Sequence, residues 1–560
     1  MKLILVNPPC LDARMSDEDS GSVPMGLYSI GAVLLDRGNR VILINLARHP
    51  EPMTFLKETL EKESPDILGF SVLNATRFGA MEGAALARRL DPSITIVFGG
   101  AGATFLARHL FLVCPEVDYI VLGEGETTIL DLVDHIASAS GEKPVHIPGL
   151  AFRHGKSVVQ TPDRKPIDDL DSLPQAARYF GFQHVSLTRG CPGRCTFCGS
   201  PDFWGRTQVR SHSPEWFVGQ LELLAGQGIT HFYFSDDTFT MDRDRVMAVS
   251  RLILDRGLAI TWAAISRVDF IDREMLVWMR RAGCVQISFG VESGSEAIRK
   301  VLGKPVKTRR IIKAFQETVS VGILPRAYFI YGSPGETRAT IQESIDLMLA
   351  IRPLGAVFYL LVVFPGTDLY RKLEAAGRVD DSLWTQPLED LPWFEVDDAL
   401  DFNRVQEFGN SLRQGFFQNV GAFARSIELL DDPELFASHA DFLSRLAMTF
   451  SHGDYGTNPA IPGAEAVAGE LFSRALSYAP DARAYLGIAM LHQKEKQFRQ
   501  AADQAALGLS RFPGSRNLVI CMAVSLMNLG QFREAQKALE PLGSAPDIAP
   551  YLDACQRALG

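Results

Sequence analysis

The feature that most constrains the fold is a repeated alternation of short apolar runs with amphipathic stretches. Between residues 1 and about 140 the chain contains five such units, whose apolar runs read KLILVN, RVILIN, DILGFS, ITIVFGG and DYIVLGEGE. Runs that are apolar on both faces predict parallel strands covered by helices on both sides. The pattern therefore predicts an α/β domain over 1–140, with a doubly wound, flavodoxin-like sheet of five parallel strands.

Polar and glycine residues follow the predicted strands of this first domain. Ligands of doubly wound sheets bind at the carboxyl ends of the strands, so several such residues at equivalent ends predict a cofactor pocket. The residues at these ends are Asn7, Ser71, Gly99, Gly100, Gly123, Glu124, Gly125 and Glu126.

A second set of β-α units follows a connector at 141–182, which contains a predicted hairpin (GLAFRHGKSVVQ) and a polar, proline-bearing stretch. Residues 183–390 hold six strand candidates, which read HVSLTRG, HFYFSDD, TWAAIS, VQISFGVESG, LPRAYFIYGSPGE and AVFYLLVVFPG. Six successive units fit an open sheet or an incomplete barrel. In both cases the active residues are expected at the carboxyl ends of the strands.

Strand signals vanish after about residue 390, and the remainder is predicted to be helical. We expect a helical extension over 391–455 and a repeat region over 456–560. QFRQA at 497–501 recurs as QFREA at 531–535, an offset of 34 residues. This is the period of the tetratricopeptide helix pair, and a generic helical tail is the alternative.

Bulk composition narrows the class of protein. A chain of 560 residues is too long for one core and predicts several domains. A net charge of −10 gives no basic surface for nucleic acid. The longest apolar run, 354–364, falls well short of the roughly 20 residues that span a bilayer. With no export signal and eight scattered cysteines, we expect a cytoplasmic protein with no membrane span.

Three of the eight cysteines, Cys191, Cys195 and Cys198, stand in the loop CPGRCTFCG directly after the first strand of the second set. Disulfides are disfavoured between cysteines so close together in a reducing compartment. A structural zinc site needs four ligands, for which only His184 or His212 lies near enough in sequence. Thiolates also suit an iron-sulfur cluster, and three of them would leave one iron of a cubane open to a substrate or cofactor.

This loop resembles the signature of the radical S-adenosylmethionine (radical SAM) enzymes, including the aromatic Phe197 before its last cysteine. The segments SDDTFT, GVESGSE, YGSPGET and FPGTDLY, which follow later strands, resemble the same family. The resemblance implies a partial (β/α)6 barrel. It also implies a [4Fe-4S] cluster on the three cysteines, with S-adenosylmethionine bound to the open iron and cleaved to a 5′-deoxyadenosyl radical.

The resemblance also assigns site residues in the second domain. Phe197 belongs to the cofactor site, and Glu292 and Ser293 are expected near the ribose of S-adenosylmethionine. Facing the barrel interior we expect Asp236, Arg326 and Tyr331, with Gly332 and Gly335 giving the backbone close access to the ligand. In the competing interpretation Asp236 or Asp237 caps the helix that begins near 241, and Glu292 is a helix-start carboxylate. For Asp237 we favour the cap.

The first domain carries NPP, PMGLYSIGAVL, GFSV, FGGAGAT and GEGE, in the order found in the cobalamin-binding domain that is often fused ahead of a radical SAM barrel. This second resemblance implies cobalamin contacts from the strand-end residues above, together with Pro8 and Thr104. None of His49, His109 and His135 stands in an Asp-x-His-x-x-Gly motif. We therefore expect no protein imidazole on cobalt. Cys10 is expected to be a small buried residue.

Two cofactors on one chain imply that they meet at one substrate, so the connector must fold the sheet's carboxyl edge against the barrel mouth. The first hypothesis is a cobalamin-dependent radical methyltransferase acting on an unactivated carbon. The second is an oxidative cyclase or rearrangement enzyme, like the anaerobic porphyrin-ester cyclase, and the third is a non-catalytic metal-binding adaptor. We expect an external one-electron reductant of flavodoxin or ferredoxin type as a partner. The terminal repeats would bind a protein partner.

Overall fold

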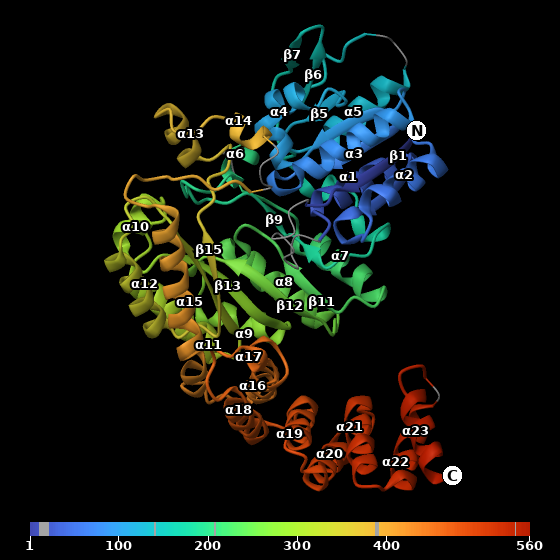
Figure 1. The fold of residues 1–560 in the computed structure, drawn as a ribbon, viewed down its shortest axis with the longest axis vertical. Helices are drawn as coiled ribbons and strands as arrows, with labels where there is room; N and C mark the ends of the chain where they lie inside the picture. The colour runs from blue at the N-terminus through green and yellow to red at the C-terminus, as the bar shows by residue number, and fades with distance from the viewer. Residues whose placement is uncertain (11–21, 139–141, 206–208, 387–390, 544) are drawn as a thin grey trace.

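The computed structural model describes residues 1–10, 22–138, 142–205, 209–386, 391–543 and 545–560. An N-terminal α/β region lies at one end of the molecule, a second α/β region in the middle and a helical arm at the other end (Figure 1). Within the described ranges no helix is both long and apolar enough to cross a bilayer.

The first sheet has the strand order β2-β1-β3-β4-β5-β6-β7, and its first five strands are parallel. The predicted N-terminal parallel sheet is therefore present, with its parallel strands in the flavodoxin-like order, but the sheet has seven strands where the sequence predicts five. The five parallel strands are β1 (Lys2–Asn7), β2 (Arg40–Asn45), β3 (Ile67–Ser71), β4 (Thr95–Gly99) and β5 (Tyr119–Val121). The helices of this region are α1 (Met25–Asp36), α2 (Pro52–Glu63), α3 (Arg77–Leu90), α4 (Ala101–Val113) and α5 (Glu126–Ala137).

The predicted hairpin forms as β6 (Leu150–His154) and β7 (Ser157–Gln160), but it belongs to the first sheet and does not stand apart as a connector. β6 pairs with β5 in antiparallel orientation, with Val121 opposite Leu150. Without the hairpin, β5 would be an edge strand with unpaired backbone groups, which proteins generally cover. The sheet therefore continues beyond residue 140.

The second sheet contains the six predicted parallel strands in the order β15-β14-β13-β12-β11-β8. They are β8 (His184–Val185), β11 (His231–Phe234), β12 (Thr261–Ser266), β13 (Cys284–Glu292), β14 (Leu324–Tyr331) and β15 (Gly355–Leu360). The helices between and after them are α7 (Pro214–Gly226), α8 (Arg243–Asp255), α9 (Arg273–Arg281), α10 (Glu296–Val301), α11 (Thr308–Ser320), α12 (Arg338–Ile351), α13 (Asp368–Ala375) and α14 (Ser382–Thr385).

The first predicted strand of this sheet, HVSLTRG, is split in two. β8 ends at Val185, and Thr188–Arg189 forms β9, which pairs in antiparallel orientation with β10 (Arg210–Ser211). The Asp236 carboxylate accepts hydrogen bonds from the backbone N–H groups of Leu187 and Thr188, at 3.0 and 2.6 Å. These bonds turn the chain out of the large sheet just before the cysteine loop.

The two faces of the second sheet differ in burial. One face carries Phe232, Trp262, Phe289 and Phe329, which are fully buried. The opposite face is open. It carries the exposed side chains of Tyr233, Ile265 and Tyr359, with 41%, 37% and 46% of their surface accessible. An open apolar face on an incomplete barrel is the kind of surface that binds a ligand.

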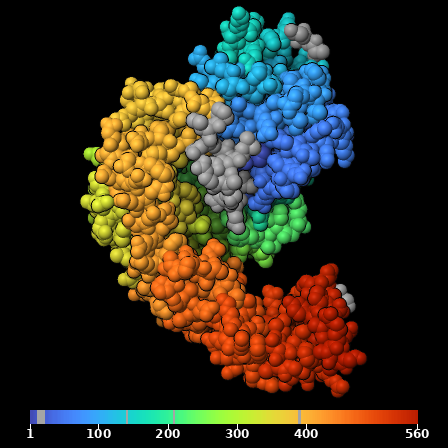
Figure 2. Space-filling view, viewed as in Figure 1, coloured from blue at the N-terminus to red at the C-terminus, as the bar shows by residue number. Residues whose placement is uncertain are grey.

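The C-terminal part is entirely helical in the described residues and forms a curved arm that reaches away from the α/β body (Figure 2). α21 begins 34 residues after α19, and α22 begins 34 residues after α20, which matches the offset of the sequence repeat. The main helices are α15 (Phe402–Arg425), α16 (Phe436–Ser451), α17 (Asp454–Thr457), α18 (Ala464–Tyr478), α19 (Ala482–Lys494), α20 (Phe498–Arg511), α21 (Arg516–Asn528), α22 (Phe532–Leu539) and α23 (Ala549–Leu559).

Candidate functional site

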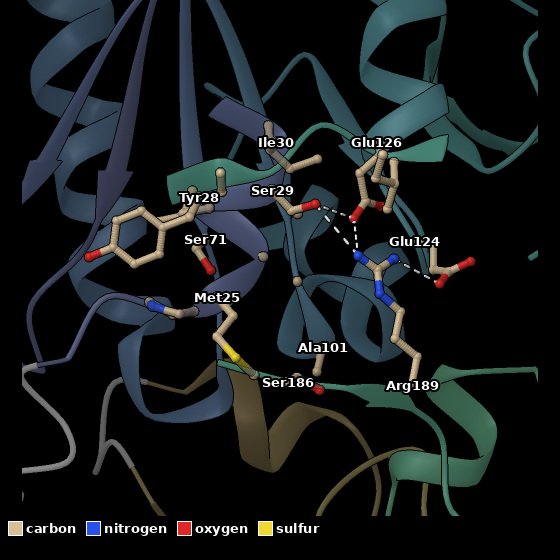
Figure 3. Close-up of a pocket in the computed structure, with 18 of the residues that line it drawn as sticks. Met25, Tyr28, Ser29, Ile30, Ser71, Ala101, Glu124, Glu126, Ser186 and Arg189 are labelled. Carbon is tan, nitrogen blue, oxygen red and sulfur yellow. Dashed lines mark hydrogen bonds and ion pairs between the residues drawn. The ribbon is translucent and has the colours of Figure 1, made fainter. Parts of the chain in front are cut away.

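A cavity of about 440 Å³ lies where the carboxyl edge of the first sheet faces the start of the second (Figure 3). The N-terminal turns of α1 contribute Met25, Tyr28 and Ser29 to its wall. The second region contributes the segment around β8 and β9, including Ser186 and Arg189. The two α/β regions therefore share one pocket, as the sequence predicts.

Most of the predicted strand-end residues line this cavity: Ser71, Gly99, Gly100, Gly123, Glu124, Gly125 and Glu126. Gly100 has φ +97°, and a Cβ atom there would lie 2.9 Å from the Val72 carbonyl oxygen. Only glycine fits at this position, and its bare backbone forms part of the wall.

Asn7, Pro8 and Thr104 do not line the cavity. Asn7 is buried and donates to the Asn45 side chain at 2.9 Å. Pro8 follows β1 as a buried residue. Thr104 supports the wall from behind, because its hydroxyl donates to the Gly100 carbonyl at 2.9 Å and accepts from the Gly123 N–H at 3.0 Å.

The two carboxylates of GEGE are engaged by arginines of the second region. Arg189 donates to Glu124 at 2.9 Å and to Glu126 at 2.6 Å (Figure 3). Arg210 donates to Glu124 at 2.8 Å. Burial alone would raise the pKa of Glu126, but the Arg189 guanidinium and the hydrogen bonds from Arg189 and Ser29 hold it below its ordinary value. The two carboxylates are therefore paired with arginines of the same chain.

The three cysteines of the loop are free thiols and partly buried. Gly193 lies between the first two. A Cβ atom at Gly193 would lie 3.1 Å from the Arg267 guanidinium, 3.3 Å from the Cys191 sulfur and 3.8 Å from the Cys195 sulfur, so these three groups surround the bare backbone of Gly193. Burial raises the pKa of the Cys198 thiol to about 12. Among the residues that the structure describes, no three His, Cys, Asp or Glu side chains gather tightly enough to hold a single metal ion.

The middle of the cysteine loop is held against α10 and α13. The Thr196 N–H donates to the Leu302 carbonyl at 3.0 Å, and the Thr196 carbonyl accepts from the Leu369 N–H at 2.8 Å. Phe197 is partly buried and packs against the main core. These contacts fix the loop backbone, and the Cys191 sulfur accepts from the Gly193 N–H and lies near the Thr238 hydroxyl, both at 3.4 Å.

Asp236 and Asp237 both act on the segment around the cysteine loop, and neither caps the next helix. Asp242 caps α8 by accepting from the Arg245 N–H, so the capping interpretation of Asp236 and Asp237 is wrong. The Asp237 carboxylate instead accepts from the Ser200 hydroxyl at 2.5 Å, two residues after the last cysteine. A capping side chain must lie directly before the helix, and α8 begins later than the sequence suggests.

Glu292 forms a buried ion pair with Lys304, in which the two charged atoms are 2.7 Å apart. α10 begins at Glu296, so Glu292 is not the helix-start carboxylate of the competing interpretation. The pair lies beside the cysteine loop, because Leu302, two residues before Lys304, accepts from the Thr196 N–H at 3.0 Å. Ser293 is fully buried and is 3.3 Å from the Ser344 hydroxyl of α12.

Arg326 lies on the open face of the second sheet, as predicted. In the strand register it stands in one row with Ile265 and Ser288, on the face opposite to the buried Phe329. It is in the amino-terminal half of β14, five residues before the strand ends, which is roughly 16 Å from the carboxyl edge.

Tyr331 does not face the barrel interior, which corrects the prediction. It shares the strand parity of Phe329, and its hydroxyl is 3.5 Å from Arg413 of α15. Gly332, with φ +86°, is likewise turned toward α15, because a Cβ atom there would lie 3.1 Å from Val405. The YGSPGET segment therefore anchors α15 at this point.

The sequence does not single out Arg189, Arg210 and Lys304, the three cations that pair with the predicted acidic site residues. Two acidic residues at a strand end, Glu124 and Glu126, were a signal that buried partners are needed. Nothing in the sequence identified which of the many basic residues would supply them.

Family models match both α/β regions. Residues 185–348 match the radical SAM superfamily, and residues 20–133 match the B12 binding domain. A protein of Pyrococcus horikoshii named as an uncharacterized methyltransferase is 30% identical over 384 residues, which cover 66% of this chain and 82% of that protein. The chain belongs to the radical SAM superfamily.

Within the superfamily, this radical SAM enzyme is also similar to an anaerobic magnesium-protoporphyrin IX monomethyl ester cyclase of Cereibacter sphaeroides. The two are 28% identical over 344 residues, which cover 58% of this chain and 56% of the cyclase. The solved structure of the cobalamin-dependent S-adenosylmethionine radical enzyme OxsB matches with a TM-score of 0.60 at 17% identity, and covers 100% of this chain and 83% of that one. That likeness shows a shared fold.

Proposed function

We propose that this radical SAM enzyme holds cobalamin in the 440 Å³ cavity and a [4Fe-4S] cluster on Cys191, Cys195 and Cys198, and that it methylates an unactivated carbon of its substrate. The observation that carries the proposal is that the chain is continuous between the two sites. The segment that walls the cavity, around Ser186 and Arg189, runs directly into the cysteine loop. One short stretch of chain therefore borders both proposed cofactor sites.

The residues present fit both groups. Three thiols on one loop are a soft donor set that suits iron and sulfide. The cavity wall at the strand ends is largely backbone, with glycines at positions 99, 100, 123 and 125. Bare backbone of this kind lets a broad, flat ligand approach closely.

When bound, the cluster supplies an electron that cleaves S-adenosylmethionine, and cobalamin supplies the methyl group. This chain's own residues would position the substrate and exclude water from it. Tyr233, Ile265 and Tyr359 give the open face an apolar surface, against which a bound substrate would pack and be shielded from solvent. Arg326, in the same face, supplies one positive charge that would orient an anionic group of the substrate or of S-adenosylmethionine.

Oxidative cyclisation is the second candidate, favoured by the similarity to the magnesium-protoporphyrin ester cyclase. The two reactions differ in their products. The test is anaerobic reconstitution with iron, sulfide, cobalamin and a low-potential reductant, followed by mass analysis of the adenosyl products. Methylation requires S-adenosylhomocysteine as well as 5′-deoxyadenosine, whereas 5′-deoxyadenosine alone would favour cyclisation. If no S-adenosylmethionine is cleaved, only the metal-binding adaptor remains.

We further propose that residues 456–560 are tetratricopeptide-like and recognise a protein partner or a peptide substrate, while an external flavodoxin or ferredoxin donates the electron. The 34-residue spacing of the helix starts supports this proposal. Deletion of residues 456–560 should then leave reductive cleavage largely intact and abolish binding of the partner. Loss of a folded, cluster-loaded protein would instead give the arm a structural role.

A further inference from the structure

One buried side chain, Arg189, joins the two α/β regions at the rim of the cavity. Its guanidinium donates to Glu124 and Glu126, which lie on the turn between β5 and α5 of the first sheet. Ser29 of α1 completes the group by donating to Glu126 at 2.7 Å. Two segments of the first region, the β5–α5 turn and α1, therefore converge on one residue of the second (Figure 3).

The charges of this group balance and are shielded from water. Glu124 and Glu126 are paired with Arg189 and Arg210, and each of the four side chains is at most 15% exposed. Arg189 and Arg210 both lie over the Trp204 ring, at 5.6 and 5.9 Å from its centroid. Removing one partner of a buried ion pair leaves an uncompensated charge, which strongly disfavours the arrangement. The group therefore holds its geometry.

Arg189 is also two residues before Cys191. Its neighbour Thr188 is held from the other side, because the Thr188 N–H and hydroxyl both donate to Asp236 at 2.6 Å. Gly190, with φ +101°, then turns the chain directly into the cysteine loop. The start of the loop is fixed between a carboxylate of the second sheet and two carboxylates of the first.

We propose that Arg189 is a positioning residue that sets the distance between the cobalamin cavity and the cluster loop, so that the two cofactors face one substrate in a fixed geometry. This inference rests on the proposed function. Glu124 and Glu126 are thereby reassigned from ligands of the cofactor to anchors of the loop that carries the cluster.

The test measures the spacing directly. Reduced cluster and cobalt(II) are both paramagnetic, so pulsed dipolar EPR of the full-length, doubly loaded enzyme reports the distance between them. We expect one narrow distance distribution in the wild type and a broadened or shifted one in Arg189→Met, with partial rescue in Arg189→Lys, which keeps the charge but loses the two-pronged donor. Because Arg189 also lines the cavity, cobalamin should dissociate at least about tenfold more readily from Arg189→Met.

The control is Arg425→Met, which removes a two-pronged ion pair with Glu470, at 2.8 and 3.1 Å, far from the cavity. It should leave the distance and the cobalamin affinity unchanged. If Arg189→Met folds poorly, the double variant Arg189→Met with Glu126→Gln removes the carboxylate that has lost its cation, since Glu124 keeps its pairing with Arg210 at 2.8 Å. It should recover folding while the distance distribution stays broad.

The outcomes separate the two claims. A wild type that loads neither cluster nor cobalamin contradicts the proposed function. A wild type that loads both, with Arg189 variants that match it in distance and cobalamin affinity, leaves the proposed function standing and overturns the positioning role.

Discussion

The buried ion pair between Glu292 and Lys304 allows a quantitative prediction. The charged atoms are 2.7 Å apart, and the two side chains are only 8% and 7% exposed. Lys304→Met preserves the length of the side chain but leaves the carboxylate buried without its partner. Loss of one member of such a pair costs about 3–5 kcal/mol of folding free energy. For a cooperative unit of 150–250 residues this lowers Tm by roughly 6–20 °C.

The double variant Lys304→Met with Glu292→Gln distinguishes this reasoning from a simple packing loss. It replaces the buried charge with a neutral amide, whose unmet hydrogen bonds cost about 1–3 kcal/mol, so it should be more stable than the single variant. Calorimetric melts of the wild type, both single variants and the double variant give the coupling energy. A Lys304→Met variant within about 1 kcal/mol of the wild type, or a double variant that melts below it, would refute the argument.

Three further predictions concern the site. Cys195→Ala should remove the iron-sulfur absorbance and leave cobalamin binding in place; retained absorbance would contradict the ligand assignment. Burial raises the pKa of Asp236 to about 6, so its carboxylate destabilises the fold above pH 6 but not below pH 4. The folding stability of Asp236→Asn relative to the wild type should therefore rise by up to about 3 kcal/mol between pH 4 and pH 7, as measured by thermal melts at each pH. A stability difference that does not change with pH would exclude this. Gly100→Ala should lose about 1–3 kcal/mol of stability and weaken cobalamin binding, because φ +97° strains any L side chain; unchanged affinity in a titration would contradict the role of that wall.

The roles of several site residues depend on contacts with distant parts of the chain, which no local sequence pattern identifies. The sequence predicts that Asp236 faces a ligand or caps a helix. In the structure its carboxylate accepts hydrogen bonds from the backbone N–H groups of Leu187 and Thr188. Tyr331 was placed in the barrel interior from its motif. Alternation along a strand says which residues share a face but not which face is covered, and α15 packs against the face that carries Tyr331.

The sequence by itself determined both α/β sheets, the helical end, the thiol loop and most of the glycine-lined cavity. Strand and helix periods, and the spacing of three cysteines over eight residues of chain, are local properties that survive without knowledge of the fold. Tertiary structure alone decided that β6 and β7 complete the first sheet and that Arg189 meets Glu124 and Glu126. The Arg189 contacts join residues more than 60 positions apart, and β5 pairs with β6 across the whole of α5. Both form because burying a charge or a sheet edge is costly until a distant segment covers it.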